Sequence, residues 1–213
     1  PKGQLTMLLG RNGAGKTTTL RTIMGLWHAS QGRVRFADKD ITAMQTPQIA
    51  GLGIAYVPEN MGIFSDLTVK ENMLLAARGA KNAAQIDDTR LKWIFKLFPA
   101  VEKFWNHPAG KLSGGQKQML AVSRAIVEPR ELLLIDEPSK GLAPVMINNM
   151  IDAFAELKAS GVTILLVEQN INFAQRLGDN VAVMDNGRVV HSGSMAAFSA
   201  DAQLQQSLLG LAL

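Results

Sequence analysis

The stretch LLGRNGAGKTTTLRTIMGL, residues Leu8–Leu26, decides how this chain folds. It contains the spacing G-x-x-x-x-G-K-T of a phosphate-binding loop, set by Gly10, Gly15, Lys16 and Thr17. The apolar run LTMLLG leads into the loop and predicts a buried strand, and the residues after the loop have the apolar spacing of a helix. The strand–loop–helix context that this motif requires is therefore present.

The loop can hold phosphate with its backbone as well as with its side chains. Glycine at Gly10, Gly13 and Gly15 lets successive N–H groups point into one concavity. A helix that begins near Gly15 adds the positive end of its dipole. The Lys16 ammonium is expected on the β- and γ-phosphates, and the Thr17 hydroxyl on Mg²⁺. The alternative is an ordinary tight turn with a solvated lysine, but the complete motif in this context favours a nucleoside triphosphate site.

The composition is that of a globular protein with a buried core. The 213 residues are 47% hydrophobic and 19% charged, and none is cysteine. The lack of cysteine excludes a disulfide framework, a thiolate metal site and a cysteine nucleophile. No apolar run reaches the roughly eighteen residues of a membrane span, and the charged start runs directly into the first strand. We therefore expect a cytosolic protein without a signal peptide.

Positive charge is concentrated in the first half of the chain. The net charge is +4, with 15 Lys/Arg and 8 Asp/Glu in residues 1–112 and 7 and 10 in residues 113–213. A basic half can indicate nucleic-acid binding. No basic run reaches five residues, which favours solvated surface charge and cations that face phosphate. No nucleic-acid partner is expected.

Apolar runs that predict strands alternate with helical patterns along most of the chain. The expected strands are Ile54–Val57, ELLLIDEP (131–138), VTILLVEQN (162–170), one in SQGRVRFADKDIT (30–42), and a hairpin over 180–193 with its turn at Asn186-Gly187. Helical spacing alone runs from Leu67 to about Val101. The pattern predicts one α/β domain over 1–213. It would combine a P-loop (RecA-like) core at 1–65 and 113–213, with a largely parallel sheet and an antiparallel pair, and a helical insertion at 66–112.

LSGGQ, Leu112–Gln116, is a second glycine-rich segment at the start of a helix. Ser113 is a plausible N-cap, with Gln116 at the third helical position of a capping box. The glycine pair also makes a second nest of N–H groups beside a serine hydroxyl. The alternative is a simple cap with a flexible lead-in. In a chain with a complete P-loop, this second nest suggests that each molecule holds its own nucleotide at one surface and a partner's at another.

LLLIDEP, Leu132–Pro138, ends a buried strand in two carboxylates. Ligands of open parallel sheets sit at the carboxyl ends of the strands, where this strand delivers Asp136 and Glu137. Asp136 suits a direct or water-mediated Mg²⁺ contact. Glu137 could take a proton from an attacking water or orient it. Two solvated carboxylates at a strand end are the alternative, which the P-loop makes less favoured.

These three segments, in this order and with a helical insertion before LSGGQ, resemble the ATP-binding cassette of ABC transporters over nearly the whole chain. Within that family the chain looks like the second ATPase subunit of branched-chain amino-acid importers. The closer match rests on YVPEN (Tyr56–Asn60), IFSDLTVKENM, DEPSKGLAP (Asp136–Pro144) and LLVEQN (Leu165–Asn170).

The resemblance implies roles for individual residues. It implies a Walker A loop formed by Gly10, Arg11, Asn12, Gly13, Ala14, Gly15, Lys16, Thr17 and Thr18. A signature that caps the partner's ATP is implied at Ser113, Gly114, Gly115 and Gln116. Asp136 takes the Walker B position, Glu59 the Q-loop position and Ser139–Leu142 the D-loop, and the Mg²⁺ ligands are expected to be Thr17, Glu59 and Asp136. Glu137 is the implied catalytic base, and it acts with Lys16 and with Gln169 at the switch position.

The resemblance also implies ATP and Mg²⁺ as cofactors, a second cassette subunit, transmembrane permease subunits that contact the helical insertion, and indirectly a solute-binding protein. Such a chain works at the cytoplasmic face of the bacterial inner membrane. Two residues depart from the broad family pattern, Glu59 in place of glutamine and Gln169 in place of histidine. The strand and the adenine-stacking aromatic that usually precede the Walker A strand are expected to be missing from 1–213.

Other ATPase classes remain as alternatives. Cassette ATPases that act on nucleic acid or the ribosome have two cassettes or a very long coiled-coil insertion. Glu59 and Gln169 suggest a slow nucleotide-binding regulator, against which the intact Glu137 counts. A P-loop kinase has no place for LSGGQ. The resemblance favours leucine, isoleucine and valine as the transported solutes, with urea, amides or aromatic compounds as alternatives. The partner cassette could be identical or a sister chain.

Overall fold

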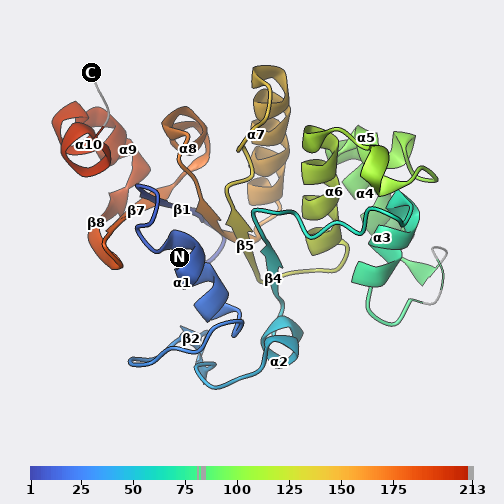
Figure 1. Cartoon of the computed structure of the whole chain (residues 1–213), viewed down its shortest axis with the longest axis horizontal. Helices are drawn as coiled ribbons and strands as arrows, with labels where there is room; N and C mark the ends of the chain where they lie inside the picture. The colour runs from blue at the N-terminus through green and yellow to red at the C-terminus, as the bar shows by residue number, and fades with distance from the viewer. Residues whose placement is uncertain (81, 83–84, 211–213) are drawn as a thin grey trace.

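A six-stranded sheet forms the centre of the molecule in the computed structural model, which describes residues 1–80, 82 and 85–210. Its strand order is β4-β5-β6-β1-β7-β8 (Figure 1). Strands β4 to β7 in this order run parallel, and β8 is antiparallel to β7. The bounds are β1 Leu5–Gly10, β4 Ile54–Val57, β5 Leu132–Asp136, β6 Thr163–Val167, β7 Asn180–Asp185 and β8 Arg188–Ser194. The predicted α/β fold with a largely parallel sheet and an antiparallel pair is confirmed.

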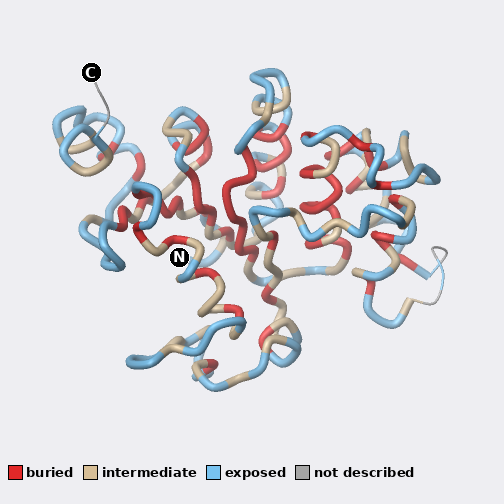
Figure 2. Tube along the Cα trace, in the orientation of Figure 1, coloured by how far each residue is buried: buried red, intermediate tan, exposed pale blue. Residues whose placement is uncertain are grey.

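Helices cover both faces of this sheet. One face carries α6 (Gly114–Ile126), α7 (Pro144–Ala159), α8 (Ile171–Leu177) and α9 (Met195–Ala200), and α10 (Ala202–Leu209) follows α9. The other face carries α1 (Lys16–Ile23) and α2 (Thr46–Gly51). The alternation of β1 explains the division, because Leu5, Met7 and Leu9 pack in the first hydrophobic cluster whereas Leu8 packs in the second. Buried residues accordingly concentrate in the strands and the helix faces turned toward them (Figure 2).

The segment between β4 and α6 is helical, as its sequence pattern predicts. It contains α3 (Val69–Ala76), α4 (Asp88–Leu97), α5 (Pro99–Lys103) and a 3₁₀ turn, η2 (Ala109–Lys111). Both α3 and α5 contact α6, and the buried side chains of the segment belong to the same hydrophobic cluster as one face of the sheet. In the described part of the chain, no helix has the length and apolar character needed to cross a membrane.

Local sequence signals account for several of the element ends. Asn186 and Gly187 have φ values of 47° and 77°, the left-handed pair of a two-residue hairpin turn between β7 and β8. At the start of α6, the Ser113 hydroxyl accepts from the Gln116 backbone N–H at 3.3 Å, and the Gln116 side chain accepts from the Ser113 N–H at 2.9 Å. The predicted hairpin turn and capping box are both confirmed.

Residues 30–42 differ from the prediction of a single strand. They form two short antiparallel strands, β2 (Arg35–Phe36) and β3 (Lys39–Asp40), because the chain reverses at Ala37, whose φ is 50°. The sequence pattern also missed α2 and α8. Both are short, with six and seven residues, so neither builds up a recognisable helical period.

Asp179 joins three elements at the amino-terminal end of the sheet. Its carboxylate accepts from the Leu5 backbone N–H at 2.8 Å and from the Lys158 ammonium at 2.9 Å. Burial acts to raise the pKa of Asp179, but the bonds from Leu5 and Lys158 outweigh it and hold the pKa below the ordinary value of 3.8. The stability that Asp179 contributes is therefore present above the unfolded pKa and is lost as the pH falls through the lower folded pKa.

Replacing Asp179 with asparagine should lower the free energy of unfolding at pH 7 by about 1–2 kcal/mol, a value reduced for the solvent exposure of the ion pair. The difference between Asp179→Asn and wild type should shrink as the pH falls below 3.8. Urea unfolding at neutral and acid pH measures both effects. Asp152→Asn, an exposed change on α7, is the control. Equal losses at both pH values would contradict this role for Asp179.

Candidate nucleotide-binding site

The P-loop, Glu59, Glu137 and Gln169 lie at the carboxyl ends of four neighbouring parallel strands. The P-loop follows β1, Glu137 follows β5, and Gln169 lies two residues beyond the end of β6. Glu59 lies two residues beyond β4, which is the outermost strand on one side of the sheet. Because parallel neighbours end at the same sheet edge, segments far apart in the sequence meet there.

The P-loop has the backbone shape that its glycines predict. Gly10, Gly13 and Gly15 have φ values of 149°, 82° and 100°. A Cβ at Gly10 would collide with the carbonyl oxygen of Met184 on β7, so only glycine fits there. Gly15 precedes α1 directly, which turns the amino-terminal end of that helix toward the loop.

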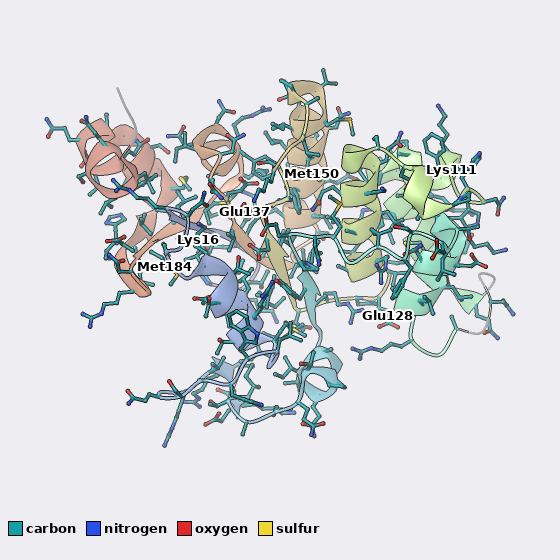
Figure 3. All side chains as sticks on the ribbon, in the orientation of Figure 1. Lys16, Lys111, Glu128, Glu137, Met150 and Met184 are labelled. Carbon is teal, nitrogen blue, oxygen red and sulfur yellow. The ribbon has the colours of Figure 1, made fainter. Side chains whose placement is uncertain are left out.

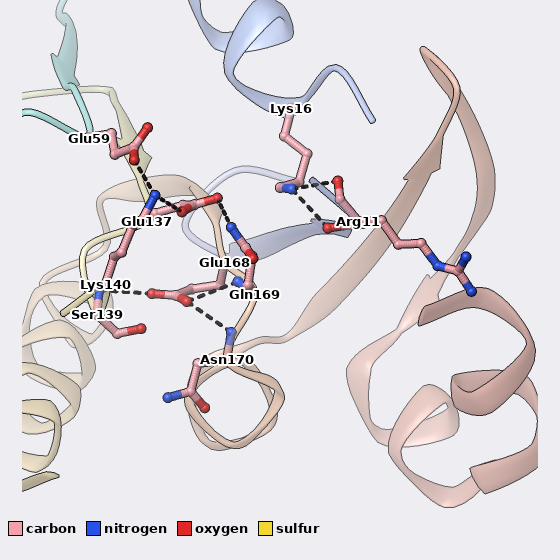
Figure 4. Close-up of polar contacts among 10 residues, drawn as sticks. Arg11, Lys16, Glu59, Glu137, Ser139, Lys140, Glu168, Gln169 and Asn170 are labelled. Carbon is pink, nitrogen blue, oxygen red and sulfur yellow. Dashed lines mark hydrogen bonds and ion pairs between the residues drawn. The ribbon is translucent and has the colours of Figure 1, made fainter. Parts of the chain in front are cut away.

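Lys16 lies folded over this loop and is 5% exposed. Its ammonium donates to the carbonyl oxygens of Gly10 at 2.8 Å and Arg11 at 3.1 Å (Figure 4). Burial lowers the pKa of Lys16, and the negative charges of Glu137 and Asp136 oppose that shift. Within the described residues the ammonium donates to neutral carbonyl groups and has no direct carboxylate partner, which favours an anion in the loop.

A cleft of about 260 Å³ opens over the loop and is lined by residues 12–18, Glu59, Glu137 and Lys140. A second cleft of about 250 Å³ adjoins it, since Asn12, Glu137 and Lys140 line both. Figure 3 shows Lys16 and Glu137 together in this region, where α1 meets the sheet edge. The structure thus brings the P-loop, Glu59 and Glu137 to one cavity.

Glu137 is held in an uncommon backbone conformation with its carboxylate at the cleft. Its φ is 48°, and its backbone N–H donates to the Val167 carbonyl at 2.9 Å. The side-chain amide of Gln169 donates to Glu137 Oε1 at 2.5 Å (Figure 4). The expected catalytic base and the expected switch residue are therefore direct neighbours.

Asp136 offers an oxygen that suits a cation. The side chain is fully buried, and Oδ2 accepts from the Tyr56 hydroxyl at 3.4 Å. Within residues 1–80, 82 and 85–210, Oδ1 has no hydrogen-bond partner. Burial raises the pKa of Asp136, whereas a hydrogen bond with the Thr17 side chain acts to lower it. An orphaned carboxylate oxygen beside a threonine hydroxyl fits a hard divalent cation.

That cation would need ligands from outside the protein. The described residues contain no cluster of three His, Cys, Asp or Glu side chains arranged to hold a metal ion. Mg²⁺ keeps several ligands that the protein does not supply, typically phosphate oxygens and waters. Thr17, Asp136 and Glu59 therefore fit a Mg²⁺ that arrives with a nucleotide.

Glu168, which the sequence interpretation missed, ties two loops of the site together. It is 2% exposed, and burial raises the pKa of its carboxyl group. Its carboxylate accepts backbone N–H bonds from Ser139 at 3.0 Å, Gln169 at 3.0 Å and Asn170 at 3.1 Å. A glutamate placed directly after an apolar strand is the signal that could have found it. Glu168 positions the segment after Glu137 against the segment that carries Gln169.

The LSGGQ segment lies away from these clefts. In the described chain, none of Ser113–Gln116 lines either cleft, and Ser113 and Gly114 are exposed at the start of α6. In Figure 3, Lys111, just before this segment, lies toward one end of the molecule, whereas Lys16 and Glu137 lie near its middle. The structure does not bring the two glycine-rich segments together within one chain.

Comparisons with known proteins agree with this arrangement. The family model described as "ABC transporter" matches residues 1–140. The branched-chain amino acid transport ATP-binding protein BraG of Pseudomonas aeruginosa is 38% identical over 209 residues, covering 98% of this chain and 89% of the relative. A probable branched-chain amino acid transport protein, LivF of Archaeoglobus fulgidus, is 36% identical over 91% of this chain and 81% of its own length.

Solved structures show the same fold. A nucleotide-free ATP-binding cassette from an ABC transporter matches with a TM-score of 0.79 and 27% identity, covering 96% of this chain and 87% of that one. A dimeric bacterial ABC transporter cassette matches with a TM-score of 0.81 and 25% identity over 92% and 87%. The chain belongs to the ABC transporter family, as one of its ATP-hydrolysing subunits.

Proposed function

We propose that this chain is the motor subunit of an importer for branched-chain amino acids, which binds Mg-ATP and hydrolyses it between two cassettes. The contact between Glu137 and Gln169 at the edge of the P-loop cleft carries the hydrolytic part of this proposal. The printed names of BraG and LivF support the class of cargo. Peripheral association with the cytoplasmic face of the bacterial inner membrane follows from the need to drive membrane subunits.

In the proposed reaction, the backbone N–H groups of Gly10–Thr18 and the Lys16 ammonium hold the phosphates. Mg²⁺, held by Thr17, Asp136 and Glu59, would neutralise charge on the phosphate oxygens. Glu137 orients the attacking water and accepts its proton. The Gln169 amide donates to the Glu137 carboxylate and supplies a hydrogen-bond donor near the γ-phosphate. Unlike an imidazole, this amide does not titrate at neutral pH.

The position of the signature supports a shared site between two cassettes. The signature residues Ser113, Gly114, Gly115 and Gln116 lie at the start of α6, where Ser113 and Gly114 are exposed, and none of them lines the clefts at the P-loop of the same chain. Such a terminus can cap the phosphates of a nucleotide held by another molecule. We therefore assign these residues to the partner's ATP, whether the partner is identical or a sister chain.

Residues 66–112 are proposed as the insertion that contacts the permease subunits. A groove of about 770 Å³ runs between the end of α1, β4, α3 and α6. Several large apolar side chains that line this groove are exposed to solvent. The exposed fractions of Leu26, Trp27 and Leu75 are 49%, 47% and 61%. Exposed apolar groups gathered along a groove are typical of a protein contact.

Glu137→Gln should keep nucleotide binding but lower ATP turnover about a hundredfold or more, since the amide cannot accept a proton. Bacteria that depend on this chain should then lose uptake of radiolabelled leucine, isoleucine and valine. ATP binding, ATP turnover and uptake are measured on the same variant. Glu156→Gln on α7 is the control. Normal uptake of all three amino acids with inactive ATPase would refute the proposed cargo, and normal turnover would refute the role of Glu137.

Ser113→Arg should leave ATP binding at its own P-loop unchanged and abolish the site on the partner. Mixed with Lys16→Ala, which loses its own nucleotide, it should regain part of the ATPase activity, because one shared site of the mixed dimer is intact. Ser160→Arg at the end of α7 is the control. Loss of ATP binding by isolated Ser113→Arg would show that the signature acts within its own chain.

Gln169→Ala should lower turnover by about ten- to a hundredfold, because a donor to a charged carboxylate is lost. Gln169→His should instead introduce an ionisation between about pH 5 and 8, where imidazole titrates. Turnover measured against pH for wild type and both variants gives the two effects, with Gln175→Ala on α8 as control. Three superimposable curves would remove Gln169 from the site.

A further inference from the structure

Lys140 places a cation between two carboxylates of the nucleotide site. Its ammonium lies 2.5 Å from Glu59 Oε1 and 3.6 Å from Glu137 Oε2 (Figure 4). All three side chains line the cleft over the P-loop, together with Thr17. Glu59 and Glu137 follow two different strands, so the lysine bridges separate parts of the site.

The backbone keeps Lys140 at this position. Its N–H donates to the Glu137 carbonyl at 3.2 Å, which closes a tight turn after the catalytic carboxylate. The preceding residue, Ser139, is held by the buried Glu168. The start of the lysine side chain is therefore fixed relative to Glu137, while its ammonium remains open to the cleft.

The charge balance of the cleft depends on this lysine. Asp136, Glu137 and Glu59 lie close enough that the last two act to raise the pKa of the first. Lys16 is the other cation of the cleft, and its ammonium is bonded to loop carbonyls rather than to a carboxylate. Lys140 is thus the cation of the cleft that contacts both Glu59 and Glu137.

We propose that the Lys140 ammonium is the counter-ion of the Glu59 carboxylate in the nucleotide-free site. This ammonium leaves Glu59 when Mg²⁺ enters with the nucleotide. The inference rests on the proposed function, because it takes Glu59 as a ligand of Mg²⁺. An ammonium 2.5 Å from Glu59 Oε1 repels a divalent cation that approaches the same carboxylate, so metal binding there favours release of the ammonium. Lys140 thereby makes nucleotide affinity less dependent on Mg²⁺, since it stabilises the metal-free site and competes with the metal.

The solvent exposure of Lys140 makes such an exchange feasible. Its side chain is 59% exposed, and ion pairs at exposed positions are weak. The released ammonium stays tethered beside Glu137 and over the phosphate cleft, where it can approach a phosphate oxygen. Lys140 is thus a positioning residue that tunes how the metal enters the site.

The test compares the dissociation constant of ADP in excess EDTA with that in excess Mg²⁺, measured by calorimetry on the whole chain. The ratio of the constant in EDTA to the constant in Mg²⁺ reports how strongly metal and nucleotide binding are coupled. Lys140→Ala should raise this ratio by about one-and-a-half- to fivefold, the range of an exposed ion pair. Lys140→Arg, which keeps the cation, should stay close to wild type. Lys96→Ala, which breaks a distant exposed pair with Glu156, is the control.

A second comparison isolates the contact with Glu59. In a Glu59→Gln background, Lys140→Ala should change the ratio less than in wild type, because the competed carboxylate is already gone. An unchanged or lower ratio in Lys140→Ala would overturn the inference about Lys140 alone. A wild-type ratio of one would instead overturn the Mg²⁺ site of the proposed function.

Discussion

The parallel pairing of β4, β5, β6 and β1 is the constraint on which the site depends. Asp136 pairs in register with Val167, and Val167 pairs with Leu8, so these strands end at nearly the same level. The loop that follows each strand carries one part of the nucleotide site. A shift in the register of one strand would separate the Glu137 carboxylate from the P-loop, because the two lie on different strands that only the sheet brings together.

Backbone donors offset part of the cost of burying a carboxylate at this site. Glu168 accepts three N–H groups, which act to lower its pKa, but burial outweighs them and the pKa is raised. Asp136 Oδ2 accepts from Tyr56, whereas Oδ1 has no hydrogen-bond partner within the described part of the chain. Glu168 has its hydrogen bonds within the protein and serves as a fixed support, whereas Asp136 keeps an oxygen for a ligand.

The fold separates the P-loop from the second glycine-rich segment, LSGGQ. The P-loop lies at the sheet edge, and the LSGGQ segment begins a helix packed against the helical insertion. The insertion helices α3 and α5 contact α6, and α6 belongs to the same hydrophobic cluster as one face of the sheet. In the proposed function, the exposed start of α6 completes the nucleotide site of a second molecule.

The sequence by itself determined the elements whose signals are local. Glycine spacing specified the P-loop, a serine and a glutamine specified the start of α6, and Asn186-Gly187 specified the hairpin, because each acts through backbone geometry over a few residues. The family resemblance assigned Gln169 and Glu137 to the same reaction, and the structure makes them direct neighbours. Only the tertiary structure decided the strand order, the support by Glu168 and the pairing of Lys140 with Glu59. These contacts join residues up to 81 positions apart, and their partners are chosen by sheet packing, which no local pattern encodes.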